Sequence, residues 1–234
     1  MRTQLETPVL LLIFNRPATT ERVLTAIRQA APKQLFVAAD GPRTGQPDDV
    51  EKCAATRALL ERIDWPCDVQ TNFADTNLGC GRRPATGISW IFEQVERAII
   101  LEDDCLPQPD FFSYAEALLE HYAETDDVMH IGGSNLLFDR LSIADSYYFS
   151  RYPLCWGWAT WRRAWRHFDF EMSSWPALRQ SRWLEELLQD ARASWYWRRV
   201  FDHVYQGGKV HIWDYQWILA CWQQRGLCVV PQHN

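Results

Sequence analysis

The chain has 234 residues, of which 47% are hydrophobic and 23% are charged, and its formal net charge is −6 at pH 7. This length and composition are those of an ordinary globular protein with one sizeable core. The acidic balance argues against a general nucleic-acid-binding protein, whose surface would carry a basic footprint. The sequence contains no run of about eighteen apolar residues, so we predict no transmembrane helix.

The cysteines and the N-terminal segment indicate the compartment. The seven cysteines are odd in number and form no C-x-x-C pair, so neither a zinc site nor a disulfide framework is expected. This favours a reducing compartment, and we predict a cytoplasmic location. The apolar run at residues 9–14 is too short for a signal peptide and lacks a small-residue cleavage site. We interpret it as a buried strand.

Strands and helices alternate over the first part of the chain. Continuous apolar runs predict buried strands at residues 9–14, 35–39, around Val69 and at 98–101. Helices are expected between them, the first capped by Thr19 or Thr20 and ended by Pro32, the second at 50–63 and the third at 85–95. The alternation predicts an α/β fold, in which a mostly parallel central sheet is flanked by helices.

Tryptophan dominates the rest of the chain, because eleven of the thirteen tryptophans follow residue 150. Asp110 is expected to cap a helix that ends near Tyr122. Strands are predicted at 128–131, 147–149 and 228–231, and helices around 161–168 and at 183–190, 194–205 and 213–224. We expect one domain over 1–234, with a ligand-binding half at 1–135 and an aromatic-rich helical half at 136–234. The chain stops soon after its last strand, so further C-terminal elements are expected to be missing.

Three adjacent acids, Glu102-Asp103-Asp104, follow the apolar strand at 98–101. Three carboxylates at the end of a buried strand repel one another unless a cation or a polar ligand compensates them. Carboxylate oxygens suit Mg²⁺ or Mn²⁺, and ligands of open α/β sheets bind outside the carboxyl ends of the strands. We therefore predict that this DXD-like triplet holds a divalent cation, which in turn holds the phosphates of a nucleotide.

Two other strand ends carry polar residues. Asn15-Arg16 follows the first strand and Asp40-Gly41 follows the second. If the strands are parallel, these residues and the acidic triplet lie along one edge of the sheet. Gly41 would let the chain pass close to a nucleotide. Arg82 or Arg83 would add bidentate contacts to phosphate.

The stretches that carry a family resemblance are LEDDCLPQPDFFSY at 101–114, Gly157-Trp158 and Trp213-Asp214, with the polar strand ends in the same order. In these features the chain resembles the GT-A glycosyltransferases, and in detail the family of the N-acetylglucosaminyltransferase that begins hybrid and complex N-glycans. It differs from that family in having Tyr215-Gln216-Trp217 after Asp214.

The resemblance implies a metal-dependent transfer of a sugar, with inversion, from a nucleotide-diphosphate sugar such as UDP-GlcNAc to a saccharide acceptor. Mn²⁺ or Mg²⁺ is the implied cofactor. Asp104 would ligate the metal and Asp214 would be the general base. Arg16 and Asp40 would contact the nucleotide base and ribose, and Asp103 would face the ribose or the donor sugar. With the strand-end residues singled out above, the predicted donor site consists of Asn15, Arg16, Asp40, Gly41, Arg83, Glu102 and Asp103.

Structural interpretations of several residues remain open beside the functional ones. Arg16, which precedes Pro17, is alternatively an ordinary turn residue. Asp214 is alternatively an acid that stabilises the N-terminus of a helix. Most tryptophans are expected in the core, whereas Trp156 or Trp158 would stack on an acceptor sugar. His233 is either a further metal ligand or a terminal surface residue, and residues 132–135 either shape an acceptor pocket or turn after a strand.

Two other functions compete with glycosyl transfer. A sugar nucleotidyltransferase also combines a parallel sheet with a carboxylate-bound metal, but it needs a Gly-rich, basic segment after the first strand. That segment here is FNRPATT at 14–20. A glycosyltransferase-like binding module without a complete active site is the second alternative.

Overall fold

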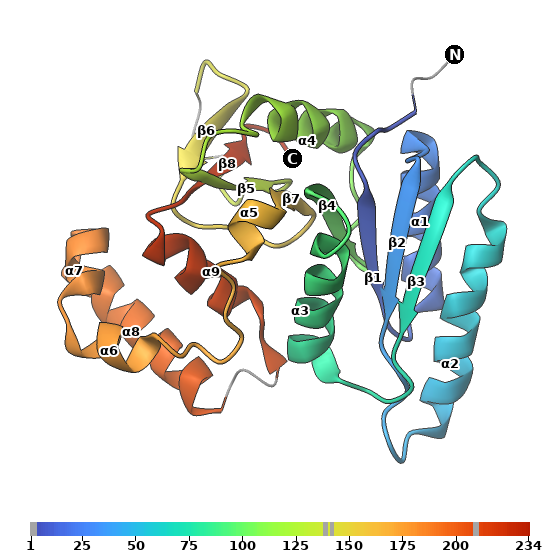
Figure 1. The fold of residues 1–234 in the computed structure, drawn as a ribbon, viewed down its shortest axis with the longest axis horizontal. Coiled ribbons are helices and arrows are strands. Elements are labelled where there is room, and N and C mark those ends of the chain that lie inside the picture. Colours follow the sequence, from blue (N-terminus) through green and yellow to red (C-terminus); the bar gives the residue numbers. More distant parts are fainter. Residues whose placement is uncertain (1–3, 138–139, 141–142, 208–210) are drawn as a thin grey trace.

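A mixed β-sheet runs through the molecule, a computed structural model that describes residues 4–137, 140, 143–207 and 211–234 (Figure 1). Over these residues the sheet has eight strands in the order β3-β2-β1-β4-β7-β5-β8-β6. Their bounds are β1 Val9–Ile13, β2 Gln34–Ala39, β3 Asp68–Phe73, β4 Arg97–Glu102, β5 Val128–Gly132, β6 Tyr147–Ser150, β7 Trp158–Trp161 and β8 Leu227–Pro231. Apart from β6 and β7, all run in one direction. The predicted α/β fold with a mostly parallel central sheet is confirmed.

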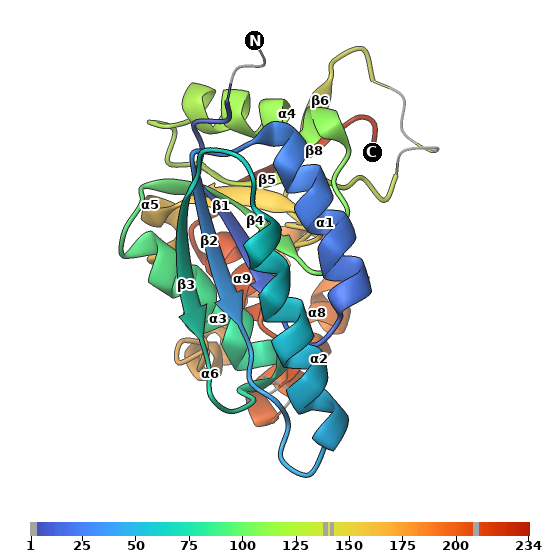
Figure 2. The ribbon, with the colours of Figure 1, turned by 90° about the vertical axis from the view of Figure 1, so that its right-hand side faces the viewer.

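The helices flank this sheet on both sides. They are α1 Pro17–Ala30, α2 Pro47–Ala58, the 3₁₀ helix η1 Leu59–Arg62, α3 Gly79–Phe92, α4 Pro109–His121, α5 Arg162–Trp165, α6 Trp175–Gln180, α7 Trp183–Leu188, α8 Ala191–Gln206 and α9 Asp214–Gln223. Figures 1 and 2 show α1 and α2 beside β1–β3, with α3 on the other face. The predicted aromatic-rich helical half corresponds to α5–α9, and its strands β6, β7 and β8 belong to the same sheet as β1–β4.

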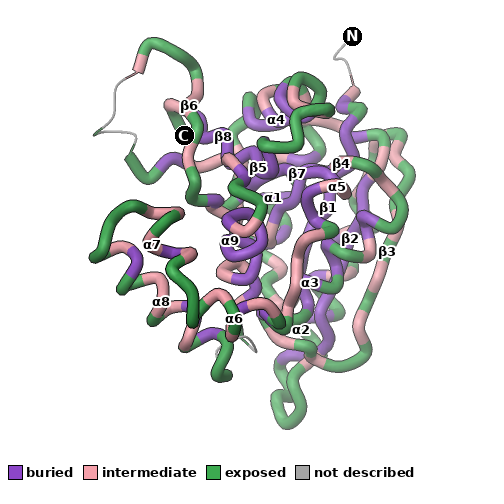
Figure 3. The backbone as a smooth tube through the Cα atoms, turned by 60° about the vertical axis from the view of Figure 1, so that its left-hand side comes forward, coloured by how far each residue is buried: buried purple, intermediate pink, exposed green. Residues whose placement is uncertain are grey.

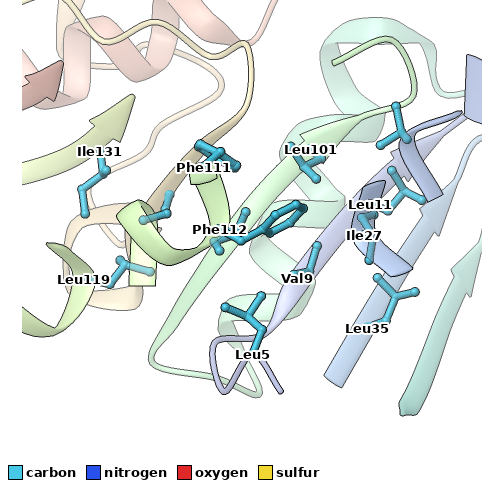
Figure 4. Close-up of a cluster of buried hydrophobic side chains, with 14 of the residues drawn as sticks. Leu5, Val9, Leu11, Ile27, Leu35, Leu101, Phe111, Phe112, Leu119 and Ile131 are labelled. Carbon is cyan, nitrogen blue, oxygen red and sulfur yellow. The ribbon is translucent and has the colours of Figure 1, made fainter. Parts of the chain in front are cut away.

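Alternating side chains divide the core into two layers. Val9, Leu11 and Leu101 face α1 and α4, where they pack with residues such as Ile27 and Phe112 (Figure 4). Leu10, Leu12 and Ile100 point to the opposite layer, which α3, α5 and α9 cover with residues that include Ile88, Trp165 and Trp217. Strands covered on both faces have continuous apolar sequences, which is why the sequence predicted β1, β2 and β4.

A third cluster of buried hydrophobic side chains connects helices α6, α7, α8 and α9. Trp175, Leu184, Phe201 and Trp222 are fully buried there. Trp222 reaches into both α8 and the loop after β6, because its ring packs on Phe201 and its Nε1–H donates to the Arg151 carbonyl at 2.5 Å. Most tryptophans are therefore packing residues, as expected.

Several predicted helix starts are wrong. Neither Thr19 nor Thr20 is an N-cap: α1 begins at Pro17, and both threonine hydroxyls donate to the Arg16 carbonyl from within the first turns. Asp110 lies inside the first turn of α4, whose N-cap position is Gln108. In both cases proline occupies the first helical position, where its missing N–H and fixed φ favour a start without a side-chain cap.

Two elements differ from the predictions because distant residues complete them. Helix α3 begins at Gly79 rather than near residue 85, although glycines and Pro84 lie in its first turns. The Asp40 carboxylate accepts the N–H groups of Leu78 and Gly79, so a residue 38 positions away supplies the cap. Strand β7 was not predicted, because a four-residue buried strand between β4 and β5 shows no periodicity of its own.

Candidate active site

The acidic triplet lies where β4 leaves the sheet, and its side chains point to different sides. Ile100 faces the α3–α9 layer and Leu101 faces the α1–α4 layer. Because strand side chains alternate, Glu102 follows Ile100 toward α9. Asp103 lies in the turn after β4 and contacts Arg16, which directly precedes α1. The triplet therefore lies at the carboxyl edge of the sheet, with side chains that reach the helices on both faces.

Arg16 is the cation that contacts the triplet. Its Nη1 lies 3.1 Å from Asp103 Oδ1 and 2.8 Å from Asp104 Oδ2. The backbone N–H of Phe14 donates to Asp103 Oδ2 at 3.2 Å. Asp103 is buried and Asp104 is half-exposed, with 53% of its side chain accessible. The carboxyl ends of β1 and β4 thus meet as predicted, and one guanidinium compensates two carboxylates.

Glu102 remains under-compensated. Burial, together with the nearby charges of Asp104, Asp103 and Asp214, raises its pKa from 4.5 to about 7, and Arg16 opposes the shift only in part. A carboxyl group surrounded by other carboxylates is the environment that a bound cation relieves. The same interaction places Asp214 within electrostatic range of the triplet, although 110 residues of sequence separate Asp214 from Asp104.

Asp214 is the first residue of α9, as the N-terminal-acid interpretation requires. Burial raises the pKa of its carboxyl group, and hydrogen bonds from the backbone N–H groups of Asp214 and Tyr215 oppose that shift. A higher pKa makes a carboxylate a stronger base toward a hydroxyl group. The position of Asp214 thus fits the N-terminal-acid interpretation, and its role as a general base stays a prediction.

A cavity of about 1100 Å³ opens beside Asp104. Its walls are the loop after β4, the start of α4, Gly133-Ser134, Trp156-Gly157 and the C-terminal residues 231–234. Trp156 is 59% exposed, and the hydroxyl of Tyr114 is buried without a hydrogen-bond partner among the described residues. Gly133 packs tightly here, since a Cβ atom would lie 2.6 Å from the Gly157 carbonyl oxygen. Ser134 and His233, for which two interpretations were open, both line this cavity.

The two candidate sugar-stacking tryptophans have different surroundings. Trp158 is fully buried, and its ring stacks on His130 with centroids 4.9 Å apart. The Nε1–H of Trp217 donates to Nδ1 of the same histidine at 3.2 Å. Trp158 is therefore a core residue and its expected stacking role is wrong, whereas Trp156 lines the cavity.

Asp40 has a structural task that occupies its whole carboxylate. Oδ1 accepts the N–H groups of Gly41 and Leu78, both at 2.8 Å. Oδ2 accepts from Gly79 N–H at 3.0 Å and from Asn77 Nδ2 at 2.9 Å. A carboxylate offers about four lone-pair sites, so these four donors saturate it. Its geometry favours a helix-capping role over contact with a nucleotide base.

Gly41 and Arg83 support the same corner. A Cβ atom at Gly41 would lie 2.5 Å from the Thr76 backbone. The glycine therefore allows two loops to pack closely, and this packing, rather than the approach of a ligand, explains its presence. Arg83 is buried and donates to the carbonyl and side chain of Asn72. Burial lowers the pKa of Arg83, and the nearby charge of Asp40 opposes this shift only in part. Arg82 instead pairs with Glu171 at 3.1 Å, on the surface.

Asn15 belongs to a network that the sequence analysis missed. Its Nδ2 donates to Asp49 Oδ1 at 2.7 Å, and Arg43 Nε donates to Asp49 Oδ2 at 2.6 Å. These hydrogen bonds, above all those from Arg43, hold the pKa of Asp49 far below its usual range. The network ties the loop after β1 to the start of α2. No motif links Asn15, Arg43 and Asp49, so only the fold reveals it.

The site residues suit a hard cation that is shared with a ligand. Among the described residues, no three histidine, cysteine, aspartate or glutamate side chains are arranged to hold a metal ion alone. Mg²⁺ and Mn²⁺ bind to one or two carboxylates and complete their coordination with substrate phosphates and water. The half-exposed Asp104 at the cavity and the under-compensated Glu102 fit that mode.

The similarity of this chain to known proteins lies in structure rather than in sequence. No protein-family model matches the sequence, and no curated protein sequence matches it. One similar solved structure is the mannosyltransferase PcManGT from Pyrobaculum calidifontis in complex with GDP-Man and Mn²⁺, with 16% sequence identity and a TM-score of 0.45. The match covers 70% of this chain and 47% of PcManGT, less than half of that protein's length. In the described part of the chain, no helix is both long and apolar enough to cross a membrane.

Proposed function

We propose that this protein is a glycosyltransferase of the GT-A type, which transfers a sugar from a nucleotide-diphosphate sugar to a saccharide acceptor. The observation that carries the proposal is the acidic triplet Glu102-Asp103-Asp104 at the carboxyl end of β4. Arg16 pairs with Asp103 and Asp104, and Asp104 lines the cavity of about 1100 Å³. That volume is slightly above the usual range of small-molecule sites, about 300–1000 Å³, and is enough for a nucleotide sugar.

Asp104 would hold Mn²⁺ or Mg²⁺ together with the donor diphosphate. The bound cation would neutralise the negative charge that develops on the departing diphosphate. Asp103 is held in place by the Phe14 N–H and Arg16, and it would accept a hydrogen bond from the donor's ribose or sugar. Glu102 and Asn15, the sequence neighbours of Asp103 and Arg16, would lie beside the donor, whereas Asp40, Gly41 and Arg83 would act indirectly by fixing the loop after β2.

The proposed reaction needs one base. The acceptor hydroxyl oxygen forms a bond to the anomeric carbon, and the bond from that carbon to the diphosphate oxygen breaks. Its electron pair leaves with the nucleoside diphosphate, and the hydroxyl proton passes to Asp214. Attack from the side opposite the leaving group inverts the anomeric centre. The raised pKa of Asp214 supports this role.

The donor is proposed to be a UDP-sugar, on the resemblance of residues 101–114. The test is release of nucleoside diphosphate from UDP- and GDP-sugars in the presence of Mn²⁺ and a panel of saccharides. Asp214→Asn is expected to bind nucleotide but to lose turnover, and the surface variant Asp126→Asn serves as the matched control. Unchanged turnover in Asp214→Asn would refute the base assignment.

A parallel assay with nucleoside triphosphates and sugar 1-phosphates separates the competing functions. A sugar nucleotidyltransferase would release pyrophosphate from a nucleoside triphosphate and a sugar 1-phosphate. A binding module would bind the nucleotide and release neither product.

A further inference from the structure

A second groove lies along α8, outside the cavity beside Asp104. Its volume is about 460 Å³, and its main lining residues are Trp195, Tyr196, Arg199, His203, Ile212 and Tyr215. Figure 3 shows α8 at the periphery, with exposed and intermediate segments, next to the mostly buried α9. The groove is therefore open to solvent on one side and closed by the helical cluster on the other.

Helical periodicity places these side chains on one face of α8. Trp195, Arg199 and His203 form one row at four-residue spacing, and Tyr196 begins a parallel row that continues with Val200. Trp195 is 62% exposed and Tyr196 is 51% exposed. Single exposed aromatic side chains are common on protein surfaces, whereas adjoining ones mark binding sites.

Arg199 gives the groove a charge. Its guanidinium carbon lies 5.0 Å from the centre of the Trp195 ring, and within the described residues no carboxylate forms an ion pair with it. The acid that lies nearest in the sequence of α8, Asp202, instead binds Arg179 at 2.6 Å and the Trp175 indole N–H at 3.1 Å. A cation without an acidic partner in the described part of the chain therefore lies among aromatic rings.

One residue that lines the groove is the sequence neighbour of the proposed catalytic base. Tyr215 lines it and directly follows Asp214 at the start of α9. After burial, the charge of Asp214 and the neighbouring Tyr196 hydroxyl both raise the pKa of Tyr215. Tyr215 thus lines the groove and lies within electrostatic range of the carboxylate that would deprotonate an acceptor.

We propose that the α8 groove binds an acidic saccharide, with sugar rings against Trp195 and Tyr196 and a carboxylate or phosphate of the sugar on Arg199. Its assignment as the distal part of the acceptor site rests on the proposed function. Flat aromatic faces with an unpaired guanidinium favour this occupant over an apolar peptide, which would leave Arg199 without a partner.

The first test measures binding without turnover. Protein labelled with ¹⁵N in its tryptophan indoles is titrated with digalacturonate, with the matched neutral galactobiose and with galactose 6-phosphate, all at equal ionic strength. The Trp195 indole signal is assigned from its loss in Trp195→Phe. We expect it to shift with the acidic sugars, at an affinity about threefold to fivefold higher than for galactobiose, as for an exposed charge pair. Whether the carboxylate or the phosphate sugar binds better identifies the anion.

Variants make the test specific. Arg199→Ala should remove the preference for acidic sugars, whereas Arg22→Ala, which removes an exposed arginine from α1, should keep it. Trp195→Ala should weaken binding of every sugar about fivefold to tenfold, and Trp195→Phe should retain most of it. No shift with any sugar, the same preference in Arg199→Ala, or a Trp195 signal that changes only with protein concentration, as for a contact between copies, would overturn the proposal.

The groove and the donor site can fail separately. A Trp195 response in a protein that binds neither UDP nor GDP would retain the saccharide groove and reject the glycosyltransferase. Nucleotide-dependent turnover with no Trp195 response would retain the enzyme and reject the groove.

Discussion

His130 offers a test of the core through pH. This histidine is fully buried, its ring accepts the Trp217 indole N–H, and its Nε2 lies 3.2 Å from the Leu154 carbonyl, to which it donates when neutral. Burial lowers its pKa from 6.5 to about 3. The folded protein therefore excludes a proton that the unfolded chain binds below pH 6.5, so the contribution of His130 to stability falls as the pH decreases from 6.5 toward 3.

The magnitude follows from linkage. At pH 5 the folded histidine is neutral and the unfolded one is mostly protonated, so 1.5 pH units below 6.5 correspond to a loss of about 2 kcal/mol relative to pH 7.5. Glu102 acts in the opposite sense: its raised pKa of about 7 means that stability increases as the pH falls from 7 to 4.5. That background is shared by the variants and cancels in their difference.

The assay is urea unfolding followed by tryptophan fluorescence at pH 7.5 and pH 5.0. His130→Gln does not titrate, so the wild type should lose about 2 kcal/mol more than this variant between the two pH values. His121→Gln, at an exposed position at the end of α4, is the matched control and should follow the wild type. Equal pH dependence in wild type and His130→Gln would refute the reasoning.

Three further predictions concern the sheet edge and the cavity. Gly41→Ala should lower the free energy of unfolding by about 1–3 kcal/mol, because its methyl group would meet the Thr76 backbone at 2.5 Å; an unchanged melting temperature would contradict this. Asp40→Asn should cost about 1–3 kcal/mol through unpaired N–H groups while nucleotide affinity persists, and calorimetry showing lost affinity at full stability would instead make Asp40 a ligand residue. Trp156→Ala should raise the KM for a sugar substrate about tenfold with little change in kcat, and steady-state kinetics with an unchanged KM would separate Trp156 from substrate binding.

The fold was largely predictable because its central strands are buried on both faces. Continuous apolar runs such as residues 9–13 and 98–101 identify β1 and β4, and their parallel pairing aligns Arg16 with Asp103. What the sequence did not reveal depends on tertiary contacts. Strand β7 is too short to show a period, and α3 begins within a glycine-rich turn because Asp40 caps it from β2.

The candidate site shows the same division. Adjacent acids after a buried strand point to a cation site from sequence alone. The sequence does not show that the Asp40 carboxylate accepts four hydrogen bonds from its own chain, that Arg83 donates to Asn72, or that the Trp158 ring stacks on His130. Each of these residues is of a type that often contacts ligands, but its hydrogen bonds and packing in this fold are structural.

The central claim is that Asp104 and a divalent cation together bind a nucleoside diphosphate. Calorimetric titration of UDP and of GDP, with and without Mn²⁺, on the wild type and on Asp104→Ala tests it most directly, with Asp126→Ala as a surface control. We predict Mn²⁺-dependent binding of one nucleotide that Asp104→Ala abolishes and Asp126→Ala preserves. Binding of neither nucleotide under any condition, or equal binding by Asp104→Ala, would contradict it.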